Sequence, residues 1–346
     1  MPEDAVRVAV SGLGSFAAVL GTAIEKSRKV RLVTCFTRTP EKRAAFSQRY
    51  ACEQDESFDA MVRRDDVDAV VLVTPNAVHR EQAELAARHR KHVFVEKPIA
   101  NTLEDGRAMI DACRAAGVVL MVAHVARRHA GNRMAKKLID AGTLGKPMLV
   151  EANLSSEQGV TLVPEEFRWR GDDLGCPGGP LMTMGVHHAD TFNYLFGPVK
   201  SVFSVFNRRH IEAPIPDVTT TVLQFESGLL GYIGSTFASP RTNWMRIYGT
   251  EANLVRSFTG VDRTRHHGRP RSVDEDTRLE LIRSTGTEAV EVPVGDPMLE
   301  QIDEFADCIR SGKKPETSGE SSMHALAVIR AAIESAATGT PVDVKV

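Results

Sequence analysis

Residues 6–17 read VRVAVSGLGSFA, and they give the strongest indication of how the first part of the chain folds. The apolar run Val6–Val10 is followed by two glycines, Gly12 and Gly14, and then by apolar residues at helical spacing. A strand, a glycine turn and a helix in this order are typical of the loop that binds the pyrophosphate of a dinucleotide. The first glycine permits a tight turn, the second lets backbone N–H groups approach the phosphates, and the small Ala17 lets helix and strand pack closely. The stretch predicts a dinucleotide-binding turn, with a purely structural turn as the alternative.

Strand and helix patterns continue to alternate as far as residue 122. Val67–Thr74 is an almost unbroken apolar run, which is expected for a strand buried on both faces of a parallel sheet. The alternation indicates an α/β fold with a doubly wound parallel sheet, and it predicts a dinucleotide-binding domain over residues 1–124. The other predicted strands are Val30–Phe36, Val93–Val95 and Val118–Val122, and the predicted helices are Lys42–Tyr50, His79–His89 and Thr102–Ala116.

Residues 125–346 have a different pattern, in which strand candidates follow one another in hairpin order. They predict a second α/β domain with a large open, mostly antiparallel sheet. The final helix, Met323–Ala336, has an apolar side and is expected to pack inward near the domain junction. We interpret the basic segment Arg263–Arg271 as a solvated loop rather than a phosphate-binding patch. The predicted strands are Met148–Leu154, Val199–Asn207, Thr219–Phe225, Leu229–Phe237, Met245–Tyr248 and Asn253–Val255, and further helices are Met134–Ala141, Met182–Leu195 and Leu299–Arg310.

Composition excludes several classes of protein. The 346 residues include 43 Lys and Arg against 45 Asp and Glu, so there is no basic excess for a nucleic-acid binder. Apolar runs fall far short of the ~20 residues that span a bilayer, and the acidic start does not resemble a signal peptide. The five cysteines are scattered and odd in number, which predicts reduced thiols in the cytoplasm and neither a zinc site nor a disulfide framework.

The second predicted strand indicates which dinucleotide is bound. NAD-selective sites usually carry Asp or Glu at the end of this strand, where it accepts from the ribose 2′-OH, but Thr34–Pro40 contains no acid. Thr37 and Arg38 stand there instead, and a hydroxyl beside a guanidinium suits a 2′-phosphate. Arg38 can equally stack on the adenine without selecting a cofactor. We therefore favour NADP(H), with NAD(H) as the alternative.

Glu96-Lys97-Pro98 follows a predicted strand at the edge where open α/β sheets bind their ligands. Pro98 keeps Lys97 extended and outside any helix. A positively charged nicotinamide ring nearby would lower the pKa of the lysine and make it a usable base. The alternative is a surface lysine in an ordinary turn.

A second cluster of polar residues lies in the stretch Pro177–Asp190, a glycine-rich lead-in followed by a predicted helix. His187 and Asp190 are three residues apart, so they share a helix face, where a carboxylate can orient or charge an imidazole. His187, His188 and Asp190 are a poor metal site, because adjacent helical residues point about 100° apart. A nucleophilic role for Cys176 has no accompanying signature.

These motifs, in this order, resemble the Gfo/Idh/MocA family of oxidoreductases along nearly the whole chain. The resemblance implies a Rossmann domain, an α/β domain with an open sheet, and homodimers or homotetramers formed through that sheet. It also implies NAD(P)-dependent oxidation or reduction of a ring alcohol such as a sugar or cyclitol, with proton transfer by Lys97 and His187. The motifs that carry it are Gly12–Ala17, Thr74-Pro75-Asn76 with His79, Glu96-Lys97-Pro98, Arg127-Arg128, Trp169-Arg170, the G-V-H-x-x-D helix and the helix around Glu304-Phe305.

The same resemblance implies which residues contact the ligands. The expected cofactor-binding residues are Gly12, Gly14, Ser15, Phe16, Thr37, Arg38, Thr74, Asn76, His79, Glu96, Lys97, Trp169 and Arg170. The expected substrate-binding residues are Thr183, Asp190, Arg170 and Arg128. Arg127, Arg128 and His124 either favour an anionic substrate or pair with acids at the domain junction. The loop Ser155–Phe167 is expected to cap the cleft.

One position departs from the family pattern. The family has an aspartate four residues before the histidine, where this chain has Thr183, which cannot stabilise an imidazolium by charge. Either Asp190 charges His187, or Lys97 does most of the proton transfer. The substrate class is then less tied to polyols, so a dehydrogenase of aromatic cis-dihydrodiols is the enzymatic alternative. A non-catalytic NAD(P)-binding regulator is the other alternative, and the presence of both Lys97 and His187 favours an enzyme over it.

Overall fold

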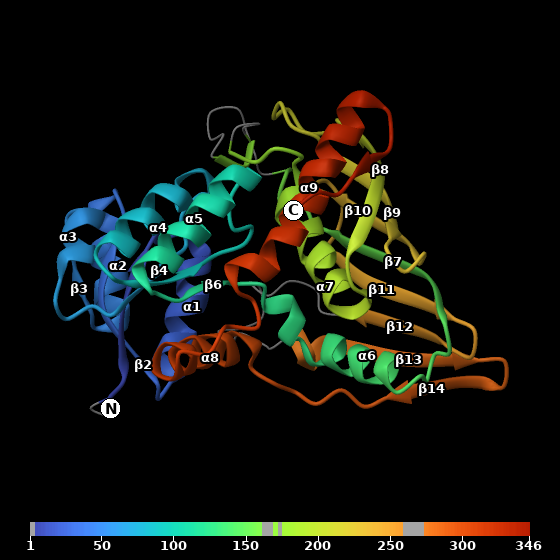
Figure 1. Ribbon diagram of the computed structural model, residues 1–346, viewed down its shortest axis with the longest axis horizontal. Helices are drawn as coiled ribbons and strands as arrows, with labels where there is room; N and C mark the ends of the chain where they lie inside the picture. The colour runs from blue at the N-terminus through green and yellow to red at the C-terminus, as the bar shows by residue number, and fades with distance from the viewer. Residues whose placement is uncertain (1–3, 161–168, 172–174, 259–272) are drawn as a thin grey trace. The chain divides into compact units, whose positions relative to one another are not determined.

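The structure is a computed structural model, and it describes residues 4–160, 169–171, 175–258 and 273–346 (Figure 1). The chain forms two compact units. The first combines Met1–Val125 with Met298–Met323, and the second combines Ala126–Pro297 with His324–Val346. The expected boundary after residue 124 stays a prediction, and the segment Met298–Met323, which the sequence assigned to the second domain, groups with the first unit. The basic segment Arg263–Arg271 lies outside the described residues.

The first unit contains a six-stranded parallel sheet in the order β3-β2-β1-β4-β5-β6. The order reverses beside β1, which makes the carboxyl ends of β1 and β4 the place where a doubly wound sheet binds its ligand. This confirms the predicted parallel, doubly wound fold. The strands are β1 Val6–Ser11, β2 Val30–Phe36, β3 Glu53–Gln54, β4 Ala69–Leu72, β5 His92–Val95 and β6 Leu120–Val122. The helices are α1 Ser15–Lys26, α2 Pro40–Tyr50, α3 Phe58–Arg63, α4 His79–Arg88, α5 Leu103–Ala116 and α8 Pro297–Ser311.

Local sequence explains the bounds of these elements. All four residues of β4 are buried, as expected for the unbroken apolar run that contains it. Helix α5 begins after Thr102, whose side chain accepts from the backbone N–H of Asp105, and it ends at Gly117 with φ +67°. Helix α8 completes the core of this unit, where the ring of Phe305 packs edge-on against Phe94 at 5.6 Å between centroids.

The second unit contains a nine-stranded sheet in the order β14-β13-β12-β11-β7-β10-β9-β8-β15. Only the β7–β10 pair among the described strands of this sheet is parallel, so the sheet is mostly antiparallel, as predicted. The strands are β7 Pro147–Ser155, β8 Val199–Asn207, β9 Val218–Phe225, β10 Leu230–Thr236, β11 Thr242–Gly249, β12 Asn253–Phe258, β13 Thr277–Arg283, β14 Gly286–Val290 and β15 Val342–Asp343.

Helices cover one face of this second sheet. They are α6 Ala130–Asp140, α7 Val186–Phe196 and the second part of α9, which spans Gly319–Thr338 (Figure 1). Ala325, Val328 and Ala332 of α9 are buried, which confirms that this helix packs inward. The other face of the sheet carries exposed apolar side chains on β8, β9 and β10, namely Phe203, Val205, Val222 and Leu230. No described helix is both long enough and apolar enough to cross a membrane.

Candidate active site

The glycine turn after β1 fits the pyrophosphate of a dinucleotide. Gly12 has φ +90°, and a Cβ there would lie 2.6 Å from the carbonyl oxygen of Val73, so no other residue fits without movement of the backbone. Gly14 is exposed with open space where its Cβ would be, and it immediately precedes α1. The first turn of α1 contains no acidic residue, so its N–H groups and helix dipole favour an anion. Ser15 is exposed and Phe16 is half-buried beside this turn.

The loop after β2 holds Thr37 and Arg38. Arg43 Nη1 donates to the carbonyl oxygen of Thr37 at 2.8 Å, which fixes the loop from within α2. Arg38 is exposed, and the described part of the chain offers its guanidinium no hydrogen-bond or ion-pair partner. A basic group on a fixed loop is thus accessible to a ligand at the end of β2.

Three predicted residues lie in and after the loop that follows β4. Thr74 Oγ1 donates to Gln82 Oε1 at 2.8 Å, and Asn76, 4% exposed, donates from Nδ2 to Asn101 Oδ1 at 3.1 Å. His79 is fully buried, with both ring nitrogens against backbone carbonyl oxygens. At the start of α4, both ring nitrogens of His79 therefore contact the protein backbone.

Glu96 and Lys97 lie just beyond the carboxyl end of β5, as the sequence predicts. Glu96 is buried, and its Oε2 accepts from the backbone N–H of Lys97 at 3.2 Å. The backbone N–H of Glu96 donates to the carbonyl of Leu72 in β4 at 2.9 Å. Lys97 is half-buried, and the Lys97–Pro98 peptide bond is cis. The strand edge that carries Gly12 thus also carries a lysine.

In the second unit, the predicted helix Met182–Leu195 is divided into two parts. A π-helical turn, Leu181–Gly185, contains Thr183 and leads directly into α7, which carries His187. Thr183 Oγ1 donates to the carbonyl of Gly179 at 3.4 Å. Gly179 has φ +53°, and a Cβ there would collide with the carbonyl oxygen of Pro216. Single π turns inside helices are frequent at functional sites.

The two histidines of α7 have different surroundings. His187 is half-buried, whereas His188 is 3% exposed. Burial, and next the positive charge of Arg256, lower the pKa of His188 to about 3, so this ring is neutral at pH 7. Arg256 is itself buried, and burial lowers its pKa to about 10.

Asp190 forms a buried pair with Arg127. Its two carboxylate oxygens accept from Arg127 Nε at 2.8 Å and Nη2 at 2.7 Å, and the two side chains are 0% and 7% exposed. The sequence left Arg127 open between an anionic substrate and an acid of the protein, and the structure pairs it with Asp190. Arg128 is also buried.

Other predicted residues fall in or beside parts of the chain outside the described residues. Trp169 is half-buried and begins the 3-10 turn Trp169–Gly171. The side chain of Arg170 lies outside the described residues, and so do residues 161–168 of the expected cleft-capping loop.

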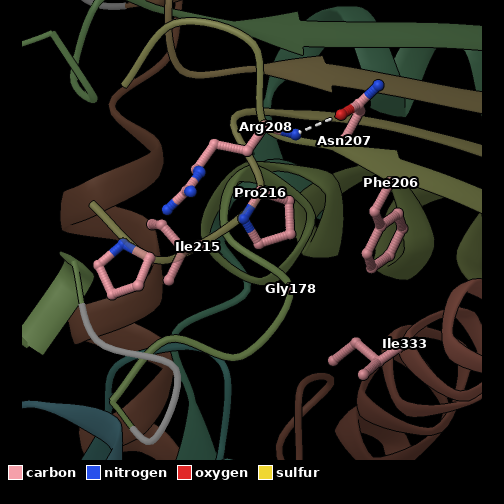
Figure 2. Close-up of a pocket in the computed structure, with 8 residues that line it drawn as sticks. Gly178, Phe206, Asn207, Arg208, Ile215, Pro216 and Ile333 are labelled. Atoms are coloured by element: carbon pink, nitrogen blue, oxygen red, sulfur yellow. Dashed lines mark hydrogen bonds between the residues drawn. The ribbon is translucent and has the colours of Figure 1, made fainter. Parts of the chain in front are cut away.

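A pocket of about 400 Å³ in the second unit was not expected from the sequence (Figure 2). It adjoins Gly178 and the loop between β8 and β9, in which Asn207 Oδ1 accepts from the backbone N–H of Arg208 at 2.8 Å. The carboxylate of Asp217 accepts hydrogen bonds from three backbone N–H groups of this loop. The sequence does carry a signal for this loop, because turn-forming residues stand at both of its ends. The pocket is lined by Gly178, Phe206, Asn207, Arg208, Pro214, Ile215, Pro216 and Ile333.

Comparisons with known proteins agree with this geometry. Residues 6–124 match the model "Oxidoreductase family, NAD-binding Rossmann fold", and residues 136–344 match "Oxidoreductase family, C-terminal alpha/beta domain". A crystal structure of a proposed NADPH-dependent oxidoreductase from Desulfitobacterium hafniense is 35% identical, with a TM-score of 0.92 over 99% of this chain and 98% of that one. The 1,5-anhydro-D-fructose reductase of Ensifer adhaerens is 28% identical over 91% of each chain. The scyllo-inositol 2-dehydrogenase (NAD(+)) of Bacillus subtilis is 27% identical over 99% of this chain and 98% of its own. The chain therefore belongs to the Gfo/Idh/MocA family of NAD(P)-dependent oxidoreductases.

Proposed function

We propose that the protein transfers a hydride between a nicotinamide cofactor and a ring hydroxyl or ketone of a sugar, cyclitol or related cyclic alcohol. The observation that carries the proposal is the shared strand edge of the first unit, where Gly12 and Lys97 follow β1 and β5. The substrates in the names of the two enzymes from Ensifer adhaerens and Bacillus subtilis, a cyclic sugar ketone and a cyclitol, support the substrate class.

NADP(H) is the proposed cofactor, with NAD(H) as the second choice. When bound, its nicotinamide supplies or accepts the hydride. The glycine turn would hold the pyrophosphate, and Thr37 with Arg38 would hold a 2′-phosphate. Further proposed cofactor-binding residues are Ser15, Phe16, Thr74, Asn76, Glu96, Lys97, Trp169 and Arg170.

Lys97 is the proposed principal acid–base residue. The carboxylate of Asp190 is paired with Arg127, and Thr183 carries no charge that could stabilise an imidazolium. The lysine would take the hydroxyl proton as the hydride leaves the carbinol carbon, and would return it in the opposite direction. His187 would hydrogen-bond the reacting oxygen, while Thr183, Arg128 and Arg170 would contact the rest of the substrate.

We also place the protein in the cytoplasm and assign it a homo-oligomeric state. The five cysteines, Cys35, Cys52, Cys113, Cys176 and Cys308, are free thiols, which suits a reducing compartment. The face of the second sheet opposite the helices carries the exposed apolar side chains that such an interface needs.

The test is spectroscopic. The protein is incubated with NADP⁺ or NAD⁺ and a panel of cyclic sugars, cyclitols and aromatic cis-dihydrodiols, and the absorbance of the reduced nicotinamide is followed. Turnover of a sugar or cyclitol supports the proposal, and turnover of dihydrodiols alone would replace its substrate class. Tight cofactor binding without turnover of any compound, in either direction, would favour a regulator.

A further inference from the structure

His79 connects two loops that meet at the proposed active site. It is the first residue of α4, and its side chain is 0% exposed. Its Nε2 lies 3.0 Å from the carbonyl oxygen of Thr74, two residues after the end of β4, and its Nδ1 lies 3.1 Å from the carbonyl oxygen of Ile99. Ile99 is two residues after Lys97. One imidazole ring therefore bridges the backbone after β4 and the backbone after β5.

The chemistry of the ring makes this bridge specific. Burial lowers the pKa of His79, while backbone carbonyls of Thr74, Ile99 and Pro98 act in the opposite direction. A neutral imidazole has one N–H, so in a given tautomer it donates to one of the two carbonyl oxygens and only contacts the other.

A chain of hydrogen bonds continues from this bridge to the glycine turn. Thr74 Oγ1 donates to Gln82 Oε1, and Gln82 Nε2 donates at 3.3 Å to Oγ of Ser11, the residue before Gly12. The bond from Asn76 to Asn101 ties the same two loops a second time. The ends of β1, β4 and β5 are thus joined through α4.

We propose that His79 is a positioning residue for Lys97, an inference that rests on the proposed function. Lys97 is held on its N-terminal side by the bond from Glu96 N–H to the Leu72 carbonyl, and on its C-terminal side by His79. His79 is buried away from solvent, so it acts through the backbone and not on the reacting atoms. Loss of the second anchor lets the lysine leave its reactive position, and small displacements of catalytic groups cost large factors in rate.

The test compares His79→Asn with a matched control, His92→Asn. His92 lies at the opposite end of β5, where its Nδ1 accepts from the backbone N–H of Val119 at 2.9 Å. We expect His79→Asn to lower kcat by about 10- to 100-fold, to change KM and the cofactor Kd much less, and to shift the pH profile of kcat. His79→Gln, whose longer amide keeps a donor near one carbonyl, should recover part of the rate. His92→Asn should lower Tm without moving kcat or the pH profile.

A second readout needs no substrate. Lysines are reductively methylated with ¹³C-formaldehyde, the Lys97 signal is assigned with Lys97→Arg, and its titration is followed by NMR with NADP⁺ present. A titration shifted by His79→Asn and unchanged by His92→Asn supports the inference even if no substrate is found, a result that would count against the proposed function alone. An unshifted titration overturns the inference even in an active enzyme, and so does an unchanged kcat and pH profile. If His79→Asn does not fold, His79→Gln alone is measured, and an unshifted titration in that variant overturns the inference.

Discussion

At the scale of single residues, Arg38 decides how the cofactor preference can be tested. The residue is exposed on a loop fixed by Arg43, so its substitution should leave the fold intact. We expect Arg38→Asp to weaken NADP(H) binding by about 1.5–3 kcal/mol, because a charge-assisted contact to a 2′-phosphate is replaced by repulsion. NAD(H) should lose less affinity or gain some. The measurement is fluorescence titration with each cofactor, and Arg107→Asp, on the exposed surface of α5, controls for net charge. Equal losses of affinity for both cofactors would mean that Arg38 stacks or packs without distinguishing a 2′-phosphate from a 2′-hydroxyl.

Removal of the Lys97 and His187 side chains should affect different kinetic constants. Lys97→Ala should lower turnover by ~10²–10⁴-fold, the range for general acid–base groups, with cofactor binding retained. His187→Ala should cost less in kcat and more in KM, because its hydrogen bond to the alcohol already exists in the ground state. Steady-state kinetics on a confirmed substrate provide the measurement. Near-normal turnover by Lys97→Ala would show that another group moves the proton.

His188 makes stability depend on pH. Its pKa is about 3 in the folded protein, against about 6.5 in the unfolded chain, so the unfolded chain binds more protons between these values. The contribution of the neutral ring is therefore present above pH 6.5 and is lost as pH falls. Between pH 7 and pH 5 the free energy of unfolding should fall by about 2 kcal/mol from this residue. Urea unfolding at both pH values measures the loss, and His188→Gln should reduce it; an equal loss in the variant would assign it to other groups.

At the scale of elements, the β8–β9 loop depends on one carboxylate. Asp217 accepts from the backbone N–H groups of Arg209, His210 and Ile211 at 2.8, 2.6 and 2.9 Å. Burial raises the pKa of Asp217, but these hydrogen bonds outweigh burial and lower it overall. Asp217→Asn should cost about 1–3 kcal/mol, because an amide cannot accept all three bonds. Thermal unfolding tests this, with Glu212→Gln, an exposed acid of the same loop, as the control. If both variants unfold alike, the carboxylate does not hold the loop.

The elements also show what sequence can and cannot predict. The strand edge with Gly12 and Lys97 was predictable, because strand order in a doubly wound sheet follows from local alternation. The pairing of Arg127 with Asp190 was not, because the residues are 63 positions apart and both have other chemically reasonable partners. Strand β14 was missed because it is exposed along most of its length and lacks an apolar alternation. Strand β13 was also missed, although Leu279 and Leu281 alternate with exposed polar residues in it. The π turn that contains Thr183 was not predicted either, because five residues are too few to show a period of their own.

For the whole molecule, the exposed apolar side chains on β8, β9 and β10 of the second sheet predict self-association. Val222 lies opposite Phe203 in β8 and Tyr232 in β10, so these side chains form one row across the face. Val222→Lys should shift the protein toward the monomer, because a charge would be buried in an apolar interface. Sedimentation velocity measures the shift. Val294→Lys, 63% exposed outside the strands, is the control. A wild-type protein that sediments as a monomer at micromolar concentration would contradict the interface.

Helix α8 carries a consequence for how this chain can be recombined. Because Phe305 packs against Phe94, a gene fragment that stops at residue 125 lacks part of its own hydrophobic core. Such a fragment would expose that surface and invite aggregation. A nucleotide-binding module transplanted into another protein would have to bring residues 298–323 with it, joined by a new linker. A single cut in the chain therefore cannot separate the two units with their cores intact.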